Sequence, residues 1–244
     1  MTCDVIILYM VFQTLFNAEL LKHTSLIMNK NWRKYWKLGT EEFNTEFFDV
    51  TKSGELLVYE GNYVYNLHTL VKKYGSPLEV VFPFVLEKRL SDLRDYFNAF
   101  IKIQNYRGKF LYHYPMKVNQ NREFIMPLIS EGAHMEVGSV NELWLIKKLW
   151  ESERFHSKLR VLCNGPKSDD YLKLINDLHA KGLAIFPIAE DEAELKTLHK
   201  FKGDVGIRVD LKVKADTHWD KKVDRFGLSE EQLLSLPPNK NFKI

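Results

Sequence analysis

Helix-like and strand-like apolar patterns alternate through most of the chain. Between residues 85 and 106, apolar side chains recur at spacings of three and four, which places them on one helical face and predicts a sheet beneath that face. Farther along, strands are expected at residues 109–114, 134–137, 159–163, 183–188 and 203–210, and helices at residues 122–131, 140–150, 168–181, 191–199 and from about 229. A repeated βα unit of this kind predicts an α/β fold with a parallel sheet.

A different pattern precedes this repeat. Residues 47–65 hold short apolar runs separated by turn-forming residues, which is typical of strands joined by tight turns. Residues 67–74 are expected to form a short helix that Gly75 ends, and residues 77–84 (PLEVVFPF) a buried strand. We therefore divide the chain into an N-terminal extension (1–46), a small element of strands and a helix (47–76) and the βα region (77–244).

A parallel sheet built from βα units is either an open, doubly wound sheet or a closed (β/α)8 barrel. The sequence has no GxGxxG or GxxxxGKS loop after an early strand, and polar residues gather just after several strands, where a barrel places its chemistry. Both observations favour the barrel. Six strands are expected from Pro77 onward, whereas a complete barrel has eight and typically about 250 residues. The sequence therefore predicts a partial (β/α)8 TIM-type barrel with about six of the eight βα units.

Composition and charge argue against several classes of protein, including nucleic-acid-binding and membrane proteins. The chain has 244 residues, of which 45% are hydrophobic and 27% charged, so it can form a packed core. Its formal charge of +3 is too small to indicate a nucleic-acid partner or a membrane surface. The most apolar stretch, residues 5–16, is shorter than the roughly 20 residues of a membrane helix and lacks the flanks of a signal peptide. Met28 offers a second start, so residues 1–27 are treated as an extension without assigned chemistry.

Cysteines and histidines give no support for a metal site. Cys3 and Cys163 lie far apart and fit neither a CxxC metal site nor a disulfide framework, which indicates unpaired thiols and a cytoplasmic protein. Cys163 lies in an apolar run and is expected in the core instead of acting as a nucleophile. The eight histidines show no HxH or HExxH spacing. No metal cofactor is therefore predicted.

Lys117 ends a predicted strand within the segment YHYPMKVNQ, next to Asn119 and Gln120. In a barrel, a side chain at this place points into the mouth. One interpretation is a solvated lysine at a strand end. The other is a partly desolvated amine that forms a Schiff base with an aldehyde cofactor. The spacing alone leaves both open.

The segment YPMKVNQNRE resembles the region around the cofactor lysine of biosynthetic arginine decarboxylases, which are pyridoxal-phosphate enzymes with an alanine-racemase-like barrel. The resemblance covers the chain from about Phe47 to the C-terminus. Its other motifs include, in order, FFDVTKSGELLV, HMEVGSVNEL, VLCNGPKSDDYL, VGIRVDL and RFGLSEEQLL. Several motifs in one order are far more specific than a single lysine.

The resemblance implies roles for five residues. Lys117 is implied to carry pyridoxal 5'-phosphate covalently. Glu136, Ser139 and Glu142 match the family's strand-end acid, serine and helix-opening glutamate, and Arg208 matches the arginine kept near the cofactor. Taken alone, Glu142 is equally a solvated first-turn carboxylate, and Arg208 a surface cation, although apolar neighbours indicate that Arg208 lies in a mostly buried strand. The resemblance also predicts an ion pair between Arg208 and Glu142, within about 4 Å.

The implied activity is the decarboxylation of L-arginine to agmatine and carbon dioxide in polyamine synthesis, by a homodimer or higher homo-oligomer that binds a small amino-acid substrate. Related enzymes act on ornithine, lysine, diaminopimelate or carboxynorspermidine. A non-catalytic truncated paralogue that regulates a decarboxylase, or a one-domain pyridoxal-phosphate carrier, is the alternative. The family's glycine-rich phosphate loop follows the last matched motif. We therefore expect residues 1–244 by themselves to lack decarboxylase activity and to associate through an unpaired strand edge.

Overall fold

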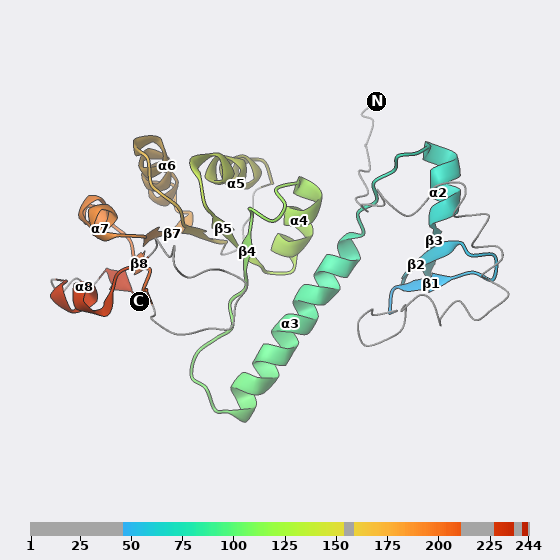
Figure 1. The fold of residues 1–244 in the computed structure, drawn as a ribbon, viewed down its shortest axis with the longest axis horizontal. Helices are drawn as coiled ribbons and strands as arrows, with labels where there is room; N and C mark the ends of the chain where they lie inside the picture. Colours follow the sequence, from blue (N-terminus) through green and yellow to red (C-terminus); the bar gives the residue numbers. More distant parts are fainter. Residues whose placement is uncertain (1–45, 154–158, 211–226, 237–240, 244) are drawn as a thin grey trace. The chain divides into compact units, whose positions relative to one another are not determined.

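The computed structural model of the protein describes residues 46–153, 159–210, 227–236 and 241–243, which belong to two compact units (Figure 1). The first unit ends at Arg89 and the second begins at Leu90. The predictions for residues 1–27, for the apolar stretch 5–16 and for Cys3 lie outside the described residues. No helix among the described residues is long and apolar enough to cross a membrane.

The first unit contains an antiparallel sheet of the strands β1 (Phe48–Val50), β2 (Leu56–Glu60) and β3 (Tyr63–Asn66). Val58 in the central strand is completely buried, and Leu56 on the same face is 8% exposed. Gly61 begins the turn from β2 to β3 with a φ of 56°, which is a backbone conformation that glycine adopts without steric cost. The predicted strands and tight turns in this region are confirmed.

The helix α2 (Leu67–Tyr74) follows β3 directly. The Asn66 side chain accepts a hydrogen bond from the backbone N–H of Thr69 at 3.1 Å, which satisfies one of the unpaired donors at the helix start. Gly75 ends the helix with a φ of 89°. The helix predicted for residues 67–74 is therefore confirmed together with its glycine stop.

The helix α3 (Pro83–Ile103) begins inside the segment that was predicted as a buried strand. Val80 and Val81 are buried, yet residues 77–82 form neither a helix nor a strand. Pro83 suits the first position of a helix, because an N–H is not needed there and the fixed φ of proline is already helical. The strand prediction for residues 77–84 is therefore wrong: a short apolar run does not by itself distinguish a strand from another buried segment.

The apolar face of α3 differs from its prediction in a second way. The helix predicted within residues 85–106 is present, and Leu90 is buried. Farther along the same face Phe97 is 47% and Phe100 62% exposed, so among the described residues no sheet covers this part of the helix. The Phe97 ring stacks on Phe110 with 4.1 Å between the ring centroids. The division between the two units falls within α3, whereas the sequence pattern predicted a boundary before Pro77.

The second unit is built on a parallel sheet in which the strands follow one another in chain order (Figure 1). The strands are β4 (His113–Pro115), β5 (His134–Val137), β6 (Arg160–Cys163), β7 (Ala184–Ala189), β8 (Val205–Ile207) and β9 (Phe242–Lys243). The helices are α4 (Arg122–Ser130), α5 (Val140–Glu153), α6 (Asp169–Ala180), α7 (Glu192–Leu198) and α8 (Glu230–Ser235). Each strand and helix expected after residue 106 overlaps one of these elements, and β9 was not anticipated.

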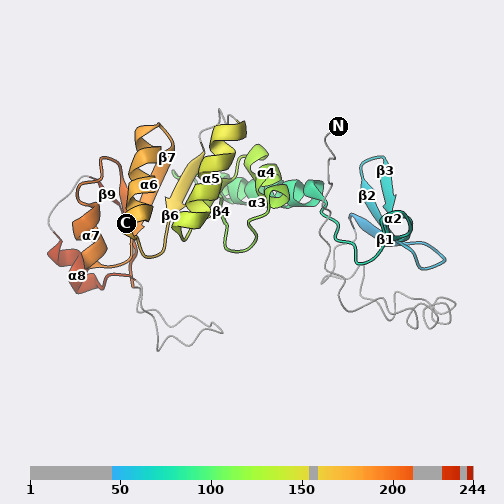
Figure 2. The same ribbon diagram turned by 90° about the horizontal axis from the view of Figure 1, so that it is seen from above.

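This strand order decides the type of sheet. Right-handed crossovers between consecutive parallel strands place all connecting helices on one face, whereas a doubly wound sheet reverses its strand order to cover both faces. Figure 1 shows α4, α5, α6 and α7 fanned around one side of the strands, and Figure 2 shows α5 and α6 next to each other over β6. The predicted α/β class is confirmed, and the topology is that of part of a (β/α)8 barrel.

The strands β5, β6 and β7 alternate strictly between buried and half-exposed residues. Successive side chains of a strand point to opposite sides of the sheet. The completely buried ones lie on the face that the helices cover and include Met135, Val137, Val161 and Cys163. The residues between them form the other face. This second face, together with the loops at the carboxyl ends of the strands, carries the candidate site.

Candidate functional site

Lys117 lies in the turn after β4, at the carboxyl end of the parallel sheet. Met116 is completely buried, and its backbone N–H donates to the carbonyl oxygen of Glu136 at 2.9 Å. The backbone N–H of Val118 donates to the carbonyl oxygen of Pro115 at 3.1 Å, which closes the turn. Lys117 itself is exposed, so the structure does not show the desolvated lysine that one interpretation expected.

The loop from Lys117 to α4 is held by three further hydrogen bonds. The hydroxyl of Tyr114 donates to the carbonyl oxygen of Asn119 at 3.1 Å. The Asn119 side chain accepts from the backbone N–H of Asn121 at 2.9 Å. Gln120 Nε2 donates to Glu142 Oε1 at 2.8 Å. The loop that carries Lys117 is therefore fixed to its own strand and to the neighbouring helix α5.

Ser139 and Glu142 organise the start of α5. Ser139 Oγ accepts from the backbone N–H of Glu142 at 3.3 Å, which caps the helix. The carboxylate of Glu142 accepts from the backbone N–H of Gly138 at 2.7 Å through Oε2, and from Gln120 through Oε1. Glu142 is only 8% exposed. The interpretation of Glu142 as a solvated first-turn carboxylate is therefore wrong.

Glu136 lies on the half-exposed face of the sheet, with Pro115 of β4 opposite it. His113 and His134 are paired neighbours on the same face, with 5.0 Å between their ring centroids. Burial, together with the nearby His113 and Arg160, lowers the pKa of His134 to about 4, and burial also lowers the pKa of His113. Both imidazoles are therefore neutral at pH 7.

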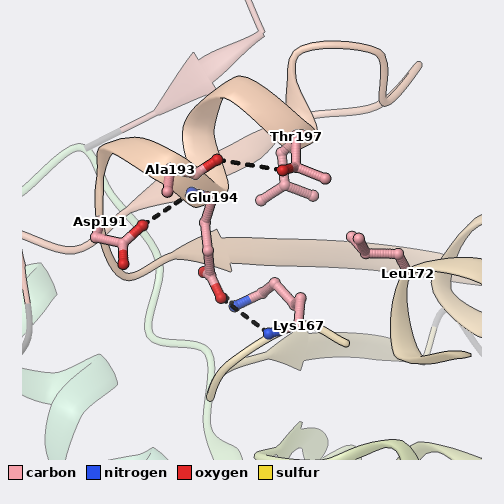
Figure 3. A pocket seen from close by; sticks show the side chains of 7 residues that line it. Lys167, Leu172, Asp191, Ala193, Glu194 and Thr197 are labelled. Atoms are coloured by element: carbon pink, nitrogen blue, oxygen red, sulfur yellow. Dashed lines mark hydrogen bonds and ion pairs between the residues drawn. The ribbon is translucent and has the colours of Figure 1, made fainter. Parts of the chain in front are cut away.

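An ion-pair network after β6 and β7 was missed by sequence reasoning (Figure 3). The side chain of Lys167 is 1% exposed, and its Nζ donates to Glu194 Oε2 at 3.1 Å and to the carbonyl oxygen of Gly165 at 2.7 Å. Glu194 also accepts from the backbone N–H groups of Lys167 at 2.9 Å and of Glu190 at 3.0 Å. Lys167 and Glu194 are 27 residues apart in the sequence, and no local pattern indicates that they meet.

This network borders a small cavity between α6 and α7. Its volume is about 230 Å³, and it is lined by Lys167, Leu172, Asp191, Ala193, Glu194, Thr197 and Leu198. Figure 3 shows the Lys167 amine directed at the Glu194 carboxylate. Because Lys167 forms an ion pair with Glu194 and its side chain is almost fully buried, its amine is much less accessible than that of Lys117.

Arg208 follows β8, and its Nη1 lies 3.0 Å from Glu190 Oε2. Glu190 is buried, and its other oxygen accepts from the backbone N–H of Gly165 at 3.1 Å. The predicted ion pair between Arg208 and Glu142 is thus wrong, since among the described residues Arg208 pairs with Glu190 and not with Glu142. The physical reason is strand adjacency: Glu190 follows β7, which pairs with β8, whereas Glu142 lies beyond β5. The Arg208 side chain is 46% exposed, which is more than we expected for a residue of a mostly buried strand.

Cys163 is completely buried at the end of β6. Burial raises the pKa of its thiol to about 12, which keeps the sulfur protonated at pH 7. The prediction that Cys163 belongs to the core is confirmed.

The described loops at the carboxyl ends of β4 to β8 thus hold an exposed amine, two buried carboxylates and a half-exposed guanidinium. Residues 91–237 match the pyridoxal binding domain of pyridoxal-dependent decarboxylases. The chain belongs to this decarboxylase family. The matched region is more than half of the chain and includes Lys117, Glu136, Ser139, Glu142 and Arg208, so the family expected from the sequence is confirmed.

Relatives of this family with similar sequences are biosynthetic arginine decarboxylases. The one from Vibrio vulnificus is 27% identical over 226 residues, and the one from Neisseria meningitidis is 29% identical over 223 residues; each alignment covers 83% of this chain. The chain spans about a third (34%) of the length of these relatives. The crystal structure of the biosynthetic arginine decarboxylase from Campylobacter jejuni matches with a TM-score of 0.59 at 21% identity, over 78% of this chain and 32% of that one, which supports the fold.

The cofactor of the family is pyridoxal 5'-phosphate, as the sequence predicted. An aldehyde cofactor needs an accessible primary amine for a Schiff base, and barrels place their chemistry at the carboxyl ends of the strands. Lys117 is exposed there, and no group among the described residues forms a hydrogen bond or ion pair with it. Lys117 and its surroundings therefore fit the part of such a site that binds the aldehyde group of the cofactor. The roles predicted for Glu136, Ser139, Glu142 and Arg208 toward the cofactor stay predictions.

Proposed function

We propose that this protein is a pyridoxal-phosphate-dependent decarboxylase of a basic amino acid, and that it converts L-arginine to agmatine and carbon dioxide. The family match supports the reaction type. The choice of arginine is supported only by the names of the relatives, which are arginine decarboxylases. Ornithine, lysine, diaminopimelate and carboxynorspermidine are the substrates against which arginine has to be compared.

The observation that carries this proposal is the exposed amine of Lys117 at the carboxyl end of β4. We propose that Lys117 forms the covalent bond to the cofactor and later holds or delivers a proton at Nζ. When bound, pyridoxal phosphate supplies an electron sink for the electron pair left by the departing carbon dioxide. The rigid turn around Met116 keeps the amine at the sheet edge while the substrate is bound.

The other site residues contribute charge and shape. The Glu190 carboxylate orients the Arg208 guanidinium, which offers a fixed positive charge to a carboxylate or phosphate group. Glu136 presents a carboxylate on the half-exposed face of the sheet, close to the strand end. Ser139 acts by capping α5 and so fixes the loop that borders Lys117.

Covalent labelling tests the assignment of Lys117. The chain is incubated with pyridoxal phosphate, reduced with borohydride and digested, and the labelled lysine is identified by mass spectrometry. Label on Lys117 is expected, with loss of that label in Lys117→Arg, which keeps the charge but cannot form the bond. Lys173→Ala, at an exposed site on α6, is the matched control and should leave the label in place. Specific labelling at another lysine would contradict the proposal.

Carbon dioxide release tests the substrate. The full product of the gene is assayed with L-arginine and with the four competing amino acids, and a kcat/KM for arginine at least tenfold above the others is expected. Faster turnover of a competing amino acid would replace arginine. Label on Lys117 without turnover of any of the five would support a non-catalytic, regulatory protein instead.

A polypeptide of residues 1–244 presents β4 at one edge of the sheet and an exposed aromatic face on α3. We propose that it associates with further chains through such surfaces and has no decarboxylase activity of its own. Sedimentation analysis checks the association, and the arginine assay checks the activity. Turnover of about 10 per second, which is typical of enzymes, would contradict the second statement.

A further inference from the structure

Two loops at the carboxyl ends of neighbouring strands are joined by a single buried carboxylate. Glu142 Oε1 accepts from Gln120 in the loop that carries Lys117, at 2.8 Å, and Oε2 accepts from the backbone N–H of Gly138 in the loop after β5, at 2.7 Å. Both bonds are short and involve an ionised acceptor, which makes them stronger than neutral hydrogen bonds. We call this arrangement of Gln120, Glu142 and Gly138 the loop clamp.

The clamp fixes one side of the Lys117 turn, and the sheet fixes the other. On the strand side, the buried Met116 donates to the carbonyl oxygen of Glu136 in β5. On the helix side, Gln120 reaches Glu142. Only Lys117, Val118 and Asn119 lie between these two anchors, and both anchors lead to the β5 strand and its loop. The backbone position of Lys117 relative to β5 therefore depends on the clamp, in addition to the hydrogen bonds from Val118 to Pro115 and from Tyr114 to Asn119.

We propose that Gln120 is a positioning residue, which acts through Glu142 to hold the Lys117 amine in its reactive place. The role given to Glu142 changes accordingly: both of its carboxylate oxygens are occupied within the protein, so it orients the loop instead of binding the cofactor. This inference rests on the proposed function, because the position of Lys117 matters only if Lys117 reacts.

The hydrogen bond between Gln120 and Glu142 can be rebuilt with the amide and the carboxylate exchanged between the two positions. In Gln120→Glu, the N–H donor is removed and two carboxylates of like charge face each other, so the contact is weakened or lost. In the double variant Gln120→Glu with Glu142→Gln, the new amide oxygen accepts from Gly138 and the new amide nitrogen donates to the new carboxylate, so both hydrogen bonds return. Gln120→Met keeps the length of the side chain without a donor and serves as a second disrupting variant.

Gln232→Glu is a matched control for the same substitution elsewhere. The Gln232 side chain accepts from the backbone N–H of Ser229 at 2.8 Å at the start of α8, and a carboxylate accepts there equally well. Effects that appear in Gln120→Glu and not in Gln232→Glu therefore come from the clamp and not from an added negative charge on the protein.

Two measurements decide the proposal. Hydrogen exchange of the peptide spanning residues 116–121 is measured without cofactor, with a peptide from α6 as the internal reference. About tenfold faster exchange is expected in Gln120→Glu and Gln120→Met, and normal exchange in the double variant, since losing a charge-assisted hydrogen bond costs about that factor or more. The rate at which pyridoxal phosphate is trapped on Lys117 by borohydride should fall about tenfold in the same two variants and recover in the double variant.

The outcomes separate this inference from the proposed function. If the unchanged chain is not labelled on Lys117, the proposed function fails, while the exchange result still reports whether the clamp exists. If Lys117 is labelled and both disrupting variants label at the unchanged rate, the positioning role is overturned. A uniform loss of protection across α6 as well as the loop would mean that Gln120 serves only stability, and would equally overturn it.

Discussion

Gly165 is the position at which one added methyl group should do most harm to the candidate site. It lies in the loop after β6 with a φ of +73°, a conformation that L-residues with a side chain rarely adopt. A Cβ atom at Gly165 would stand 2.2 Å from the carbonyl oxygen of Gly138 and 3.1 Å from its carbonyl carbon. These are backbone atoms, so no side-chain rotation relieves the clash.

The expected cost of Gly165→Ala has two parts. The left-handed backbone conformation costs an alanine roughly 1–2 kcal/mol, and forcing a methyl group into a packed site adds about 1–3 kcal/mol. The sum is about 2–5 kcal/mol, which is a large part of the 5–15 kcal/mol by which typical domains are stable. Because Gly138 also donates to Glu142, any shift of its backbone reaches the loop that holds Lys117.

Two other glycines separate these contributions. Gly182, after α6, has a φ of +95° but no heavy atom within 4 Å of an added Cβ, so Gly182→Ala should cost only the roughly 1–2 kcal/mol of backbone strain. Gly138→Ala places its Cβ 3.8 Å from Glu142 Oε2, an ordinary contact, and should be tolerated. Urea unfolding curves of the three variants give the free energies, provided that the slopes agree. Equal midpoints for Gly165→Ala and Gly182→Ala would refute the close contact between the two loops.

Three further predictions follow from burial and charge. Because the pKa of His134 is about 4 in the folded chain and near 6.5 in the unfolded one, the unfolded state binds more protons between these values, so stability should fall as the pH drops from about 6.5 to 4. One pKa unit corresponds to about 1.4 kcal/mol, and because His134 is partly exposed the expected loss of stability is reduced to about 1–2 kcal/mol. In His134→Gln the urea midpoint should depend less on pH over this range. A pH dependence equal to that of the unchanged chain would contradict the role of His134. Lys167→Met leaves the Glu194 carboxylate, whose side chain is only 15% exposed, with its two backbone N–H donors but without its charged partner, and should cost about 1–3 kcal/mol in the same assay. Lys181→Met, which breaks an exposed pair, should cost at most about 1 kcal/mol, and equal losses would refute the difference in burial. The raised pKa and full burial of Cys163 predict that iodoacetamide alkylates it only when the chain unfolds, which peptide mapping over a urea series checks; rapid alkylation without urea would show an open strand end.

Local sequence patterns were sufficient to predict the helices and strands of the second unit apart from β9. Spacings of three and four, alternation over short runs and glycine stops are local signals, and they act through contacts within a few residues of one another. The same local character explains the failure at residues 77–84, where an apolar run leads into α3 and not into a strand. A strand needs a partner for its backbone hydrogen bonds, and a partner is not encoded in the run itself.

The family, its cofactor and the place of Lys117 at a strand end were also readable, because the motif around Lys117 is contiguous. The pairing of the charged residues, in contrast, could not be predicted from local sequence patterns. Arg208 meets Glu190 instead of Glu142, because β8 lies beside β7 in the sheet. Lys167 and Glu194, on separate βα units, neutralise each other in the interior. Such pairs depend on which strands become neighbours, and the chain acquires those neighbours only when the parallel sheet is assembled.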